Sequence, residues 1–582
     1  MWFLCFVPAL LSGESNFQLW VSNIPNRFIL EPYPGIQYNS HDLYNFYNFS
    51  SKVPDSATSI KSYGTPGQLN SASVDGGLSY HTRTGINGTV IENAQIVPMD
   101  ISILPIEFAS RVDIYKNNLT PYGIPSTSGF INFDVFSFNR SYIDLSVGSY
   151  STYSARTLFG YEIDDSILSA GFSYTSASND FDYIDNLHFI NKAYNLDYQK
   201  WSLIGQYKCT FFSFYFSHTT KEAGTGMKYA GYGRQRDDFN LLSFRSALFD
   251  TPIYIDYLYW INRFKNQLSS DDTHFNHTLS TKAERKIDFN FLISTISVIN
   301  KYYAVNSTTI GYKTLDEVHL VLMNKIPLQS LEIGVGADNI YRFDNVYYCV
   351  PSISSSLKIF DGLLLSGSIS SILNLPSFND LYWPKQGSAE GNADLKPEDG
   401  VKYQTGILYI IFPFTFTTSY SVSYINNLIL WFPHNGGVWK PENIKKIFSR
   451  VADFQIKFEE ALQDFILKGS FSFSYNYTID NDPSSQYYSK RIIYIPLYKT
   501  VSYAGIGYTK DFDISFFMRS CSERFVTEEN TAWLTAYFVF DIAIRLYIFQ
   551  FSVENVFDTQ YQEIEGYPQM GRYFKGGVHI EI

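Results

Sequence analysis

The chain has 582 residues, of which 17% are charged and 18% aromatic, and its formal net charge is −12. Phosphate binding needs concentrated Lys and Arg, so this charge balance argues against nucleic acid as a partner. Four widely spaced cysteines form no CxxC pair and no Cys/His cluster, so neither a disulfide framework nor a zinc site is indicated. No run approaches the roughly 18–20 consecutive apolar residues of a transmembrane helix. The abundance of aromatic rings is instead typical of membrane β-barrels, where rings gather at both interfaces.

The N-terminus carries one apolar segment of signal-peptide length. Trp2 to Leu11 is followed by small polar residues and lacks a basic start, and its length is that of a secretory h-region. We therefore expect residues 1–15 to be a signal peptide, truncated at its beginning, and the protein to be exported.

Residues 16–135 differ in character from the rest of the chain. Short apolar patches alternate there with Gly-, Pro- and Asn-rich turns, and no long strand is evident. The alternation of Phe17–Ser22, at the start of this region, is of the kind that adds a strand to a partner protein. The same six residues also suit an ordinary connection between leader and domain.

From residue 136 to the end, a two-residue alternation recurs about every 20 residues, as expected for membrane strands of about 10 residues with their connections. In Phe538–Ile548 every second residue is apolar, and Asp541 and Arg545 lie on the other face. At that spacing, residues 136–582 predict a barrel of about 22 antiparallel transmembrane strands. A lumen of that width requires a plug, for which residues 16–135 are the candidate.

The last strand predicts how the barrel closes. Phe574, Val578, Ile580 and Ile582 lie on one face of it. Pairing this strand with the first strand of the same sheet would close the barrel and leave no edge.

Motifs in both regions resemble those of TonB-dependent outer-membrane receptors, in the right order. The resemblance in the first region rests on Gly64–Leu69, Ser73–Gly76, Ile86–Asn93, Leu104–Tyr115, Tyr122–Gly123 and Gly129–Phe133. Of these, Leu104–Tyr115 resembles the helix and strand that precede the end of the plug in the family. In the second region it rests on Gly148–Tyr153, Asn179–Tyr183, Leu375–Tyr382, Gly391–Glu398 and Asn427–Trp431, and the last of these is similar to cobalamin-receptor-like members.

The resemblance implies an all-β membrane protein of the bacterial outer membrane, with an N-terminal α+β plug inside its barrel. It implies TonB-dependent import of a scarce, bulky solute, with no enzymatic activity and no resident metal or cofactor. The expected partners are outer-membrane lipid, a small chelate or corrinoid, and the periplasmic TonB domain with its inner-membrane motor. The candidate TonB box is Phe17, Gln18, Leu19, Trp20, Val21 and Ser22.

The position of the apical plug loops in the family indicates which residues contact the ligand. These candidates are Tyr80, His81, Arg83, Asn93 and Gln95. Their aromatic and amide groups suit a flat, amide-rimmed corrinoid such as cobalamin, and suit an iron–siderophore chelate nearly as well. A passive or gated pore with a degenerate plug is a further alternative.

Two departures from the family pattern concern the seating of the plug. Asp75 stands where the family commonly has Arg, and Lys116–Asn118 stands where it has Arg-Gly-Pro. Because Asp75 reverses a buried charge, we expect the contacts between plug and barrel to differ from those of the family, which leaves open whether TonB energises this plug.

Overall fold

The computed structural model describes residues 34–39, 55–96, 99–116, 127–135, 141–184, 189–225, 233–266, 271–385, 389–433, 438–508 and 512–582. The expected signal peptide and the candidate TonB box, Phe17–Ser22, lie outside these residues. No helix in the described residues is long and apolar enough to cross a membrane.

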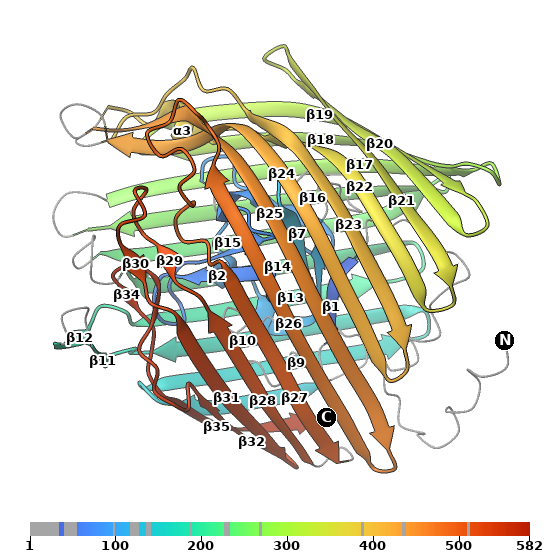
Figure 1. Ribbon diagram of the computed structural model, residues 1–582. Coiled ribbons are helices and arrows are strands. Elements are labelled where there is room, and N and C mark those ends of the chain that lie inside the picture. Colours follow the sequence, from blue (N-terminus) through green and yellow to red (C-terminus); the bar gives the residue numbers. More distant parts are fainter. Residues whose placement is uncertain are drawn as a thin grey trace.

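The described residues form a closed barrel of 22 strands, in which every strand pairs antiparallel with its neighbours (Figure 1). The barrel strands are β8 Tyr142–Gly148, β9 Thr152–Ile163, β10 Ser166–Ala177, β13 Tyr198–Lys208, β14 Phe212–Gly224, β15 Arg234–Leu248, β16 Thr251–Lys265, β17 Asp271–Asp288, β18 Ile293–Ser307, β19 Gly311–Pro327, β20 Leu331–Arg342, β21 Val346–Phe360, β22 Leu363–Asn374, β23 Glu398–Ile411, β24 Phe414–Pro433, β25 Trp439–Leu462, β26 Phe465–Asp480, β27 Tyr498–Tyr508, β28 Phe512–Cys521, β31 Tyr537–Leu546, β32 Phe549–Glu554 and β35 Tyr573–Glu581. The predicted barrel and its strand number are confirmed.

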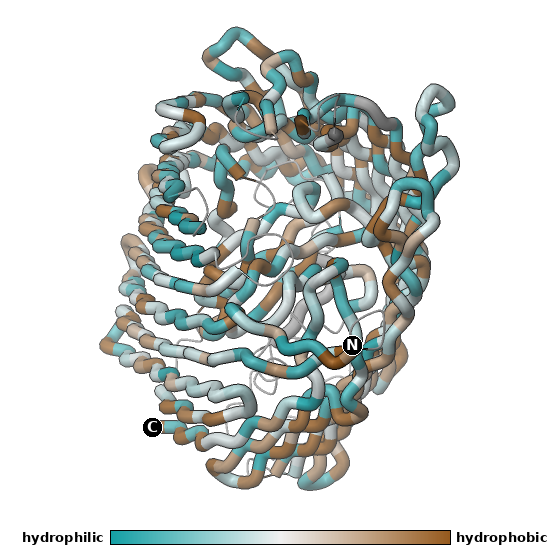
Figure 2. Tube along the Cα trace, turned by 90° about the vertical axis from the view of Figure 1, so that its left-hand side faces the viewer, coloured by the Kyte–Doolittle hydropathy of each residue, from teal (hydrophilic) through white to brown (hydrophobic). Residues whose placement is uncertain are grey.

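Hydrophobic and hydrophilic residues alternate along the barrel strands (Figure 2), which gives a strand one apolar and one polar side. In β31, Phe538 and Leu546 are 44% and 46% exposed on the outer face, whereas Asp541 is 4% exposed on the inner face. Apolar side chains outside and polar ones inside are what lipid and a filled lumen require. The amphipathic pattern read from this strand is therefore confirmed.

The first and last strands close the barrel. β35 pairs antiparallel with β8, and Val578 lies opposite Leu145 and Ile580 opposite Ile143. The predicted closure is confirmed, and it leaves no free edge on which another chain could add a strand.

The plug is built from a five-stranded sheet and a separate hairpin, drawn in blue within the barrel in Figure 1. The sheet order is β1-β6-β7-β4-β5, and β2 pairs with β3. The elements are β1 Pro34–Asn39, β2 Thr58–Ser62, β3 Asn70–Val74, η2 Ser79–His81, β4 Thr82–Ile86, β5 Thr89–Ile91, η3 Ile101–Ile103, η4 Ile106–Phe108, β6 Ala109–Tyr115 and β7 Gly129–Val135.

The helical content of the plug is smaller than the sequence predicted. Where a helix was expected in the first half of Leu104–Tyr115, this range has one three-residue 3-10 turn, η4, and a second such turn, η3, lies just before Leu104. Pro105 has no backbone N–H to donate, so one continuous helix across this point would lose a hydrogen bond. The strand half of the same motif forms β6 as expected.

Plug and barrel share one apolar core. Ile86 and Ile114 of the plug belong to the same buried cluster as Ile204, Phe239 and Trp260 of the barrel wall. Burial of each such side chain contributes roughly 1.5–3 kcal/mol relative to exposure. The barrel wall is thus part of the plug's own core.

The two rims of the barrel differ in the length of their connections. One rim has short turns, such as 164–165 between β9 and β10 and 463–464 between β25 and β26. The other, here called the long-loop rim, carries long connections such as 178–197, 375–397, 481–497, 522–536 and 555–572. Barrels of this kind have short periplasmic turns and longer extracellular loops, so the long-loop rim faces the outside of the cell. The short elements in these connections are β11 Phe181–Ile184, β12 Ile190–Ala193, α3 Phe378–Tyr382, β29 Arg524–Phe525, β30 Trp533–Leu534, β33 Gln562–Ile564 and β34 Tyr567–Pro568.

Candidate functional site

The first apical plug segment, Leu78–Arg83, is held against the barrel wall by one carboxylate. The Tyr80 hydroxyl lies 3.3 Å from Glu398 Oε1, and His81 Nε2 lies 2.7 Å from Glu398 Oε2. Glu398 is the first residue of β23 and is fully buried, and His81 is 2% exposed. The structure therefore places Tyr80 and His81 at the long-loop end of the barrel, bonded to the wall.

Arg83, the last residue of the first apical segment, connects that segment to the barrel wall and to the second apical segment. Its guanidinium is 3.5 Å from Asn374 Oδ1 and 3.9 Å from Glu92 Oε1. Glu92 in turn accepts hydrogen bonds from Lys301 Nζ at 2.5 Å and from the Tyr303 hydroxyl at 2.8 Å. Burial alone would raise the pKa of Glu92, but Lys301 and Arg83 outweigh it and lower the pKa to about 2. The carboxylate therefore stays charged and joins plug to barrel.

The second apical plug segment, Glu92–Ile96, carries the two predicted amide residues. Asn93 Oδ1 accepts hydrogen bonds from the backbone N–H of Gln95 at 2.9 Å and of Ile96 at 3.3 Å, which shapes the turn. Gln95 Nε2 lies 3.0 Å from His274 Nδ1 on β17. Within the described part of the chain, Asn93 Nδ2 and Gln95 Oε1 are buried and have no hydrogen-bond partner.

All five candidate residues lie beneath the long-loop rim, in two groups. Tyr80, His81 and Arg83 share one segment, Asn93 and Gln95 share the other, and the Arg83–Glu92 pair joins the segments. Sequence reasoning missed their barrel partners, which are Glu398, Asn374 and His274, and it missed Glu92 with its partner Lys301. Glu398 is the last residue of the motif Gly391–Glu398, so the sequence motif included this residue but did not show that it contacts the plug.

Deeper in the lumen, the plug residue Asp75, which stands where the family commonly has Arg, forms an ion pair with a barrel lysine. Asp75 Oδ2 lies 2.7 Å from Lys402 Nζ of β23, and both side chains are at most 3% exposed. Burial alone would raise the pKa of Asp75, but the charges of Lys402 and Lys116 outweigh it and lower the pKa. Lys116, the other departure, lies 3.3 Å from Asp453 and 3.6 Å from Asp55. The plug is therefore seated by ion pairs, one of them between a plug acid and a barrel lysine.

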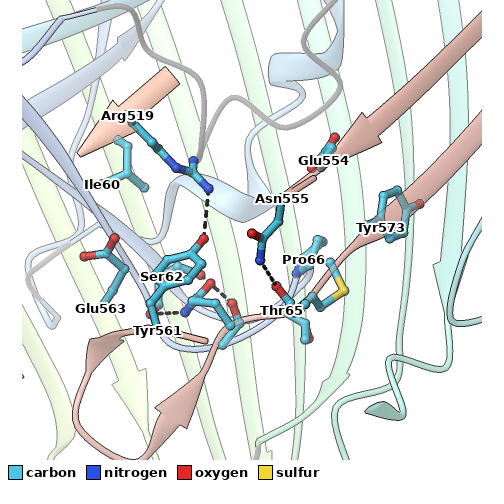
Figure 3. A pocket seen from close by; sticks show the side chains of 14 residues that line it. Ile60, Ser62, Thr65, Pro66, Arg519, Glu554, Asn555, Tyr561, Glu563 and Tyr573 are labelled. Carbon is cyan, nitrogen blue, oxygen red and sulfur yellow. Dashed lines mark hydrogen bonds between the residues drawn. The ribbon is translucent and has the colours of Figure 1, made fainter. Parts of the chain in front are cut away.

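A separate pocket opens beside the hairpin turn of the plug (Figure 3). It holds about 580 Å³ of empty space, open solvent included, between Gly64–Pro66 and the β32–β35 connection. Arg519 lines it and donates to the Tyr561 hydroxyl at 2.8 Å (Figure 3). None of the five candidate residues lines this pocket, so it is distinct from the apical segments.

No group of three or more His, Cys, Asp or Glu side chains in the described residues could hold a metal ion.

Comparisons with known proteins agree with this architecture. The family model described as "TonB dependent receptor-like, beta-barrel" matches residues 107–556. The vitamin B12 transporter BtuB of Vibrio vulnificus (strain YJ016) is 41% identical over 71 residues, which are 12% of this chain and 11% of that transporter. The chain thus matches about a tenth of the length of this curated relative.

Solved structures share the fold at low sequence identity. The copper transporter OprC has a TM-score of 0.75 at 13% identity, covering 94% of this chain and 98% of that one. The siderophore receptor PirA from Acinetobacter baumannii has a TM-score of 0.74 at 12% identity, covering 94% and 98%. A mutant ferric enterobactin receptor from Pseudomonas aeruginosa in complex with enterobactin has a TM-score of 0.75 at 12% identity, covering 94% and 99%. The family match spans most of the chain, and this protein of the bacterial outer membrane belongs to the TonB-dependent receptor family.

Proposed function

We propose that the protein imports a scarce, bulky solute across the outer membrane, energised by TonB, and that this solute is cobalamin or a similar corrinoid. The observation that carries the proposal is the position of the two apical plug segments beneath the long-loop rim, where a solute arriving from outside meets the plug. Membership of the TonB-dependent receptor family supports the class of transport.

The choice of a corrinoid rests on chemistry and on one relative. A corrinoid is rimmed with amides, which are both donors and acceptors. The second apical segment carries an amide donor on Asn93 and an amide acceptor on Gln95, both buried and both without a hydrogen-bond partner among the described residues. The short match to the vitamin B12 transporter favours the same ligand. The structural neighbours named as copper and siderophore proteins favour the alternative of a metal chelate.

The proposed partner is the periplasmic domain of TonB with its inner-membrane motor. The candidate box Phe17–Ser22 would pair with it by strand addition, which uses main-chain hydrogen bonds for affinity. No catalytic activity is part of the proposal.

Uptake of labelled cobalamin by cells making the protein tests ligand and energy source together, with cells lacking the protein as the reference. We expect uptake that a protonophore abolishes and that deletion of Phe17–Ser22 also abolishes. Uptake that survives both treatments would support a passive or gated pore. Uptake no greater than that of the reference cells would exclude cobalamin, and the same assay with ferric siderophores would then test the chelate alternative.

A further inference from the structure

The connection between β22 and β23 contacts both apical plug segments. Its described parts, residues 375–385 and 389–397, together with the flanking Asn374 of β22 and Glu398 of β23, are here called the clamp. The first contact is made by the fully buried carboxylate of Glu398. Four groups converge on its two oxygens: His81 Nε2 at 2.7 Å, the Ile429 N–H at 2.8 Å, Asn374 Nδ2 at 3.1 Å and the Tyr80 hydroxyl at 3.3 Å. A buried carboxylate with this many partners fixes the geometry of all of them.

The second contact is made by α3, at the other end of the clamp. The backbone N–H of Phe378 donates to the Ala94 carbonyl at 2.8 Å, and that of Asn379 donates to the Gln95 carbonyl at 3.2 Å. The Phe378 ring is buried with Val305 and Ile310, and Ala94 packs against this cluster. The second apical segment is therefore held through its backbone as well as through apolar contact.

The two contacts belong to one braced body. Ser377 and Asp380 form a reciprocal capping box at the start of α3. Trp431 of β24 donates its indole N–H to Asp380 Oδ1 at 2.8 Å. Across the clamp, the Asn392 N–H donates to the Asp380 carbonyl at 2.7 Å, and the Gly391 N–H donates to the Trp383 carbonyl at 2.8 Å. These bonds tie α3 to the segment that leads into Glu398.

We propose that the clamp fixes the two apical plug segments as one mechanical unit, with Glu398 as the positioning residue for Tyr80 and His81. A solute that displaces one segment then displaces the other, and both movements reach the barrel through β23. The ligand-binding role of these segments rests on the proposed function. The mechanical coupling itself can be tested without any ligand.

The test is amide hydrogen exchange in the full-length protein, folded in lipid bilayers and read by peptide mass spectrometry. Glu398→Gln keeps the shape but leaves one accepting oxygen, so at least one buried donor loses its acceptor. We expect amides of residues 78–83 to exchange about tenfold faster. The proposal further requires faster exchange in residues 92–96 and at Phe378 and Asn379, which Glu398 does not touch.

Asp399→Asn is the matched control. Asp399 is the next residue of β23, is exposed, and bonds to Asn426 and Asn427 on the neighbouring strand. Exchange in both apical segments should stay as in the wild-type protein. Glu398→Asp keeps the charge on a shorter side chain and should restore part of the protection in both segments.

Phe378→Ala tests the coupling in the opposite direction. Because coupling free energies are reciprocal, loosening α3 must speed exchange in residues 78–83 as well as in 92–96. Heat-dependent mobility in gel electrophoresis shows whether each variant still has a folded barrel, and either variant alone suffices for the test. If each variant alters only the segment it contacts, the segments are anchored independently and the proposal is overturned.

Discussion

The pair of Asp75 and Lys402 gives the sharpest test of how this plug is seated. The two charged atoms are 2.7 Å apart, and the side chains are 1% and 3% exposed. Removing one partner of such a pair leaves a charge buried without compensation, which costs about 3–5 kcal/mol. Asp75→Asn isolates this effect, because Asp75 has φ 54° and Asn tolerates that left-handed backbone nearly as well.

Lys402 does not lose all of its partners in Asp75→Asn. Its Nζ still donates to the carbonyls of Lys116 and Ser128, at 2.5 and 3.1 Å, so we expect a cost near the lower end of that range. Lys402→Met leaves Asp75 with Ser421 as a neutral partner and should cost about as much. In the double variant Asp75→Asn, Lys402→Met, no charge of the pair remains. We expect its loss of stability to be about 2 kcal/mol smaller than the sum of the losses in the two single variants.

Urea titration of ion conductance across planar bilayers measures these losses, because unfolding of the plug opens the barrel. At about 1.5–2 kcal/mol per molar urea, a loss of about 3 kcal/mol lowers the midpoint by about 1.5–2 M. Asp134→Asn is the control, since Asp134 pairs with Arg111 inside the plug and is 29% exposed, and it should shift the midpoint little. Additivity of the single variants within 0.5 kcal/mol would refute the reasoning.

Two further predictions concern the plug hairpin and the clamp. Burial lowers the pKa of Lys61 to about 8, so the folded plug releases this proton before the unfolded chain does, and plug stability should rise between pH 8 and pH 10.5. Lys61→Met should abolish this rise and stabilise the plug at pH 7 by about 2 kcal/mol. If the urea midpoint changes with pH by the same amount in the wild-type protein and in Lys61→Met, the prediction is wrong. A Cβ at Gly391 would lie 2.6 Å from the Trp383 backbone nitrogen, whereas at Gly367 the nearest atom is 3.8 Å away. Gly391→Ala should therefore loosen α3 by about 1–3 kcal/mol and speed its amide exchange, while Gly367→Ala leaves both unchanged.

The barrel was predictable because its signal is local and repeated. Alternation such as that of Phe538 and Asp541 needs only the two-residue period of a strand and a membrane that separates the faces. The same holds for the closing strand, whose apolar face at Val578 and Ile580 shows that it requires a neighbour. The loss of the expected helix near Pro105 was also readable, since a proline restricts a helix locally.

Only the plug side of the candidate site could be nominated from the sequence. Tyr80, His81 and Gln95 were nominated because motifs mark the apical loops, and the structure places them beneath the long-loop rim. Their partners Glu398 and His274 are far away in the sequence, and only the closed barrel brings them near. Alternation places His277, between Phe275 and Leu279, on the outer face, but no local pattern shows which plug residue a lumenal histidine such as His274 contacts.

The charge reversal at Asp75 illustrates what physical chemistry constrains and what it leaves free. A buried charge needs an opposite charge, and either polarity satisfies that need. Here the compensating lysine is on β23, the strand that also carries Glu398. Because alternate residues of a strand share a face, Glu398 and Lys402 both point into the lumen, about 13 Å apart along the strand. One barrel strand therefore holds the plug at two heights, near the long-loop rim through Tyr80 and His81 and deeper through Asp75.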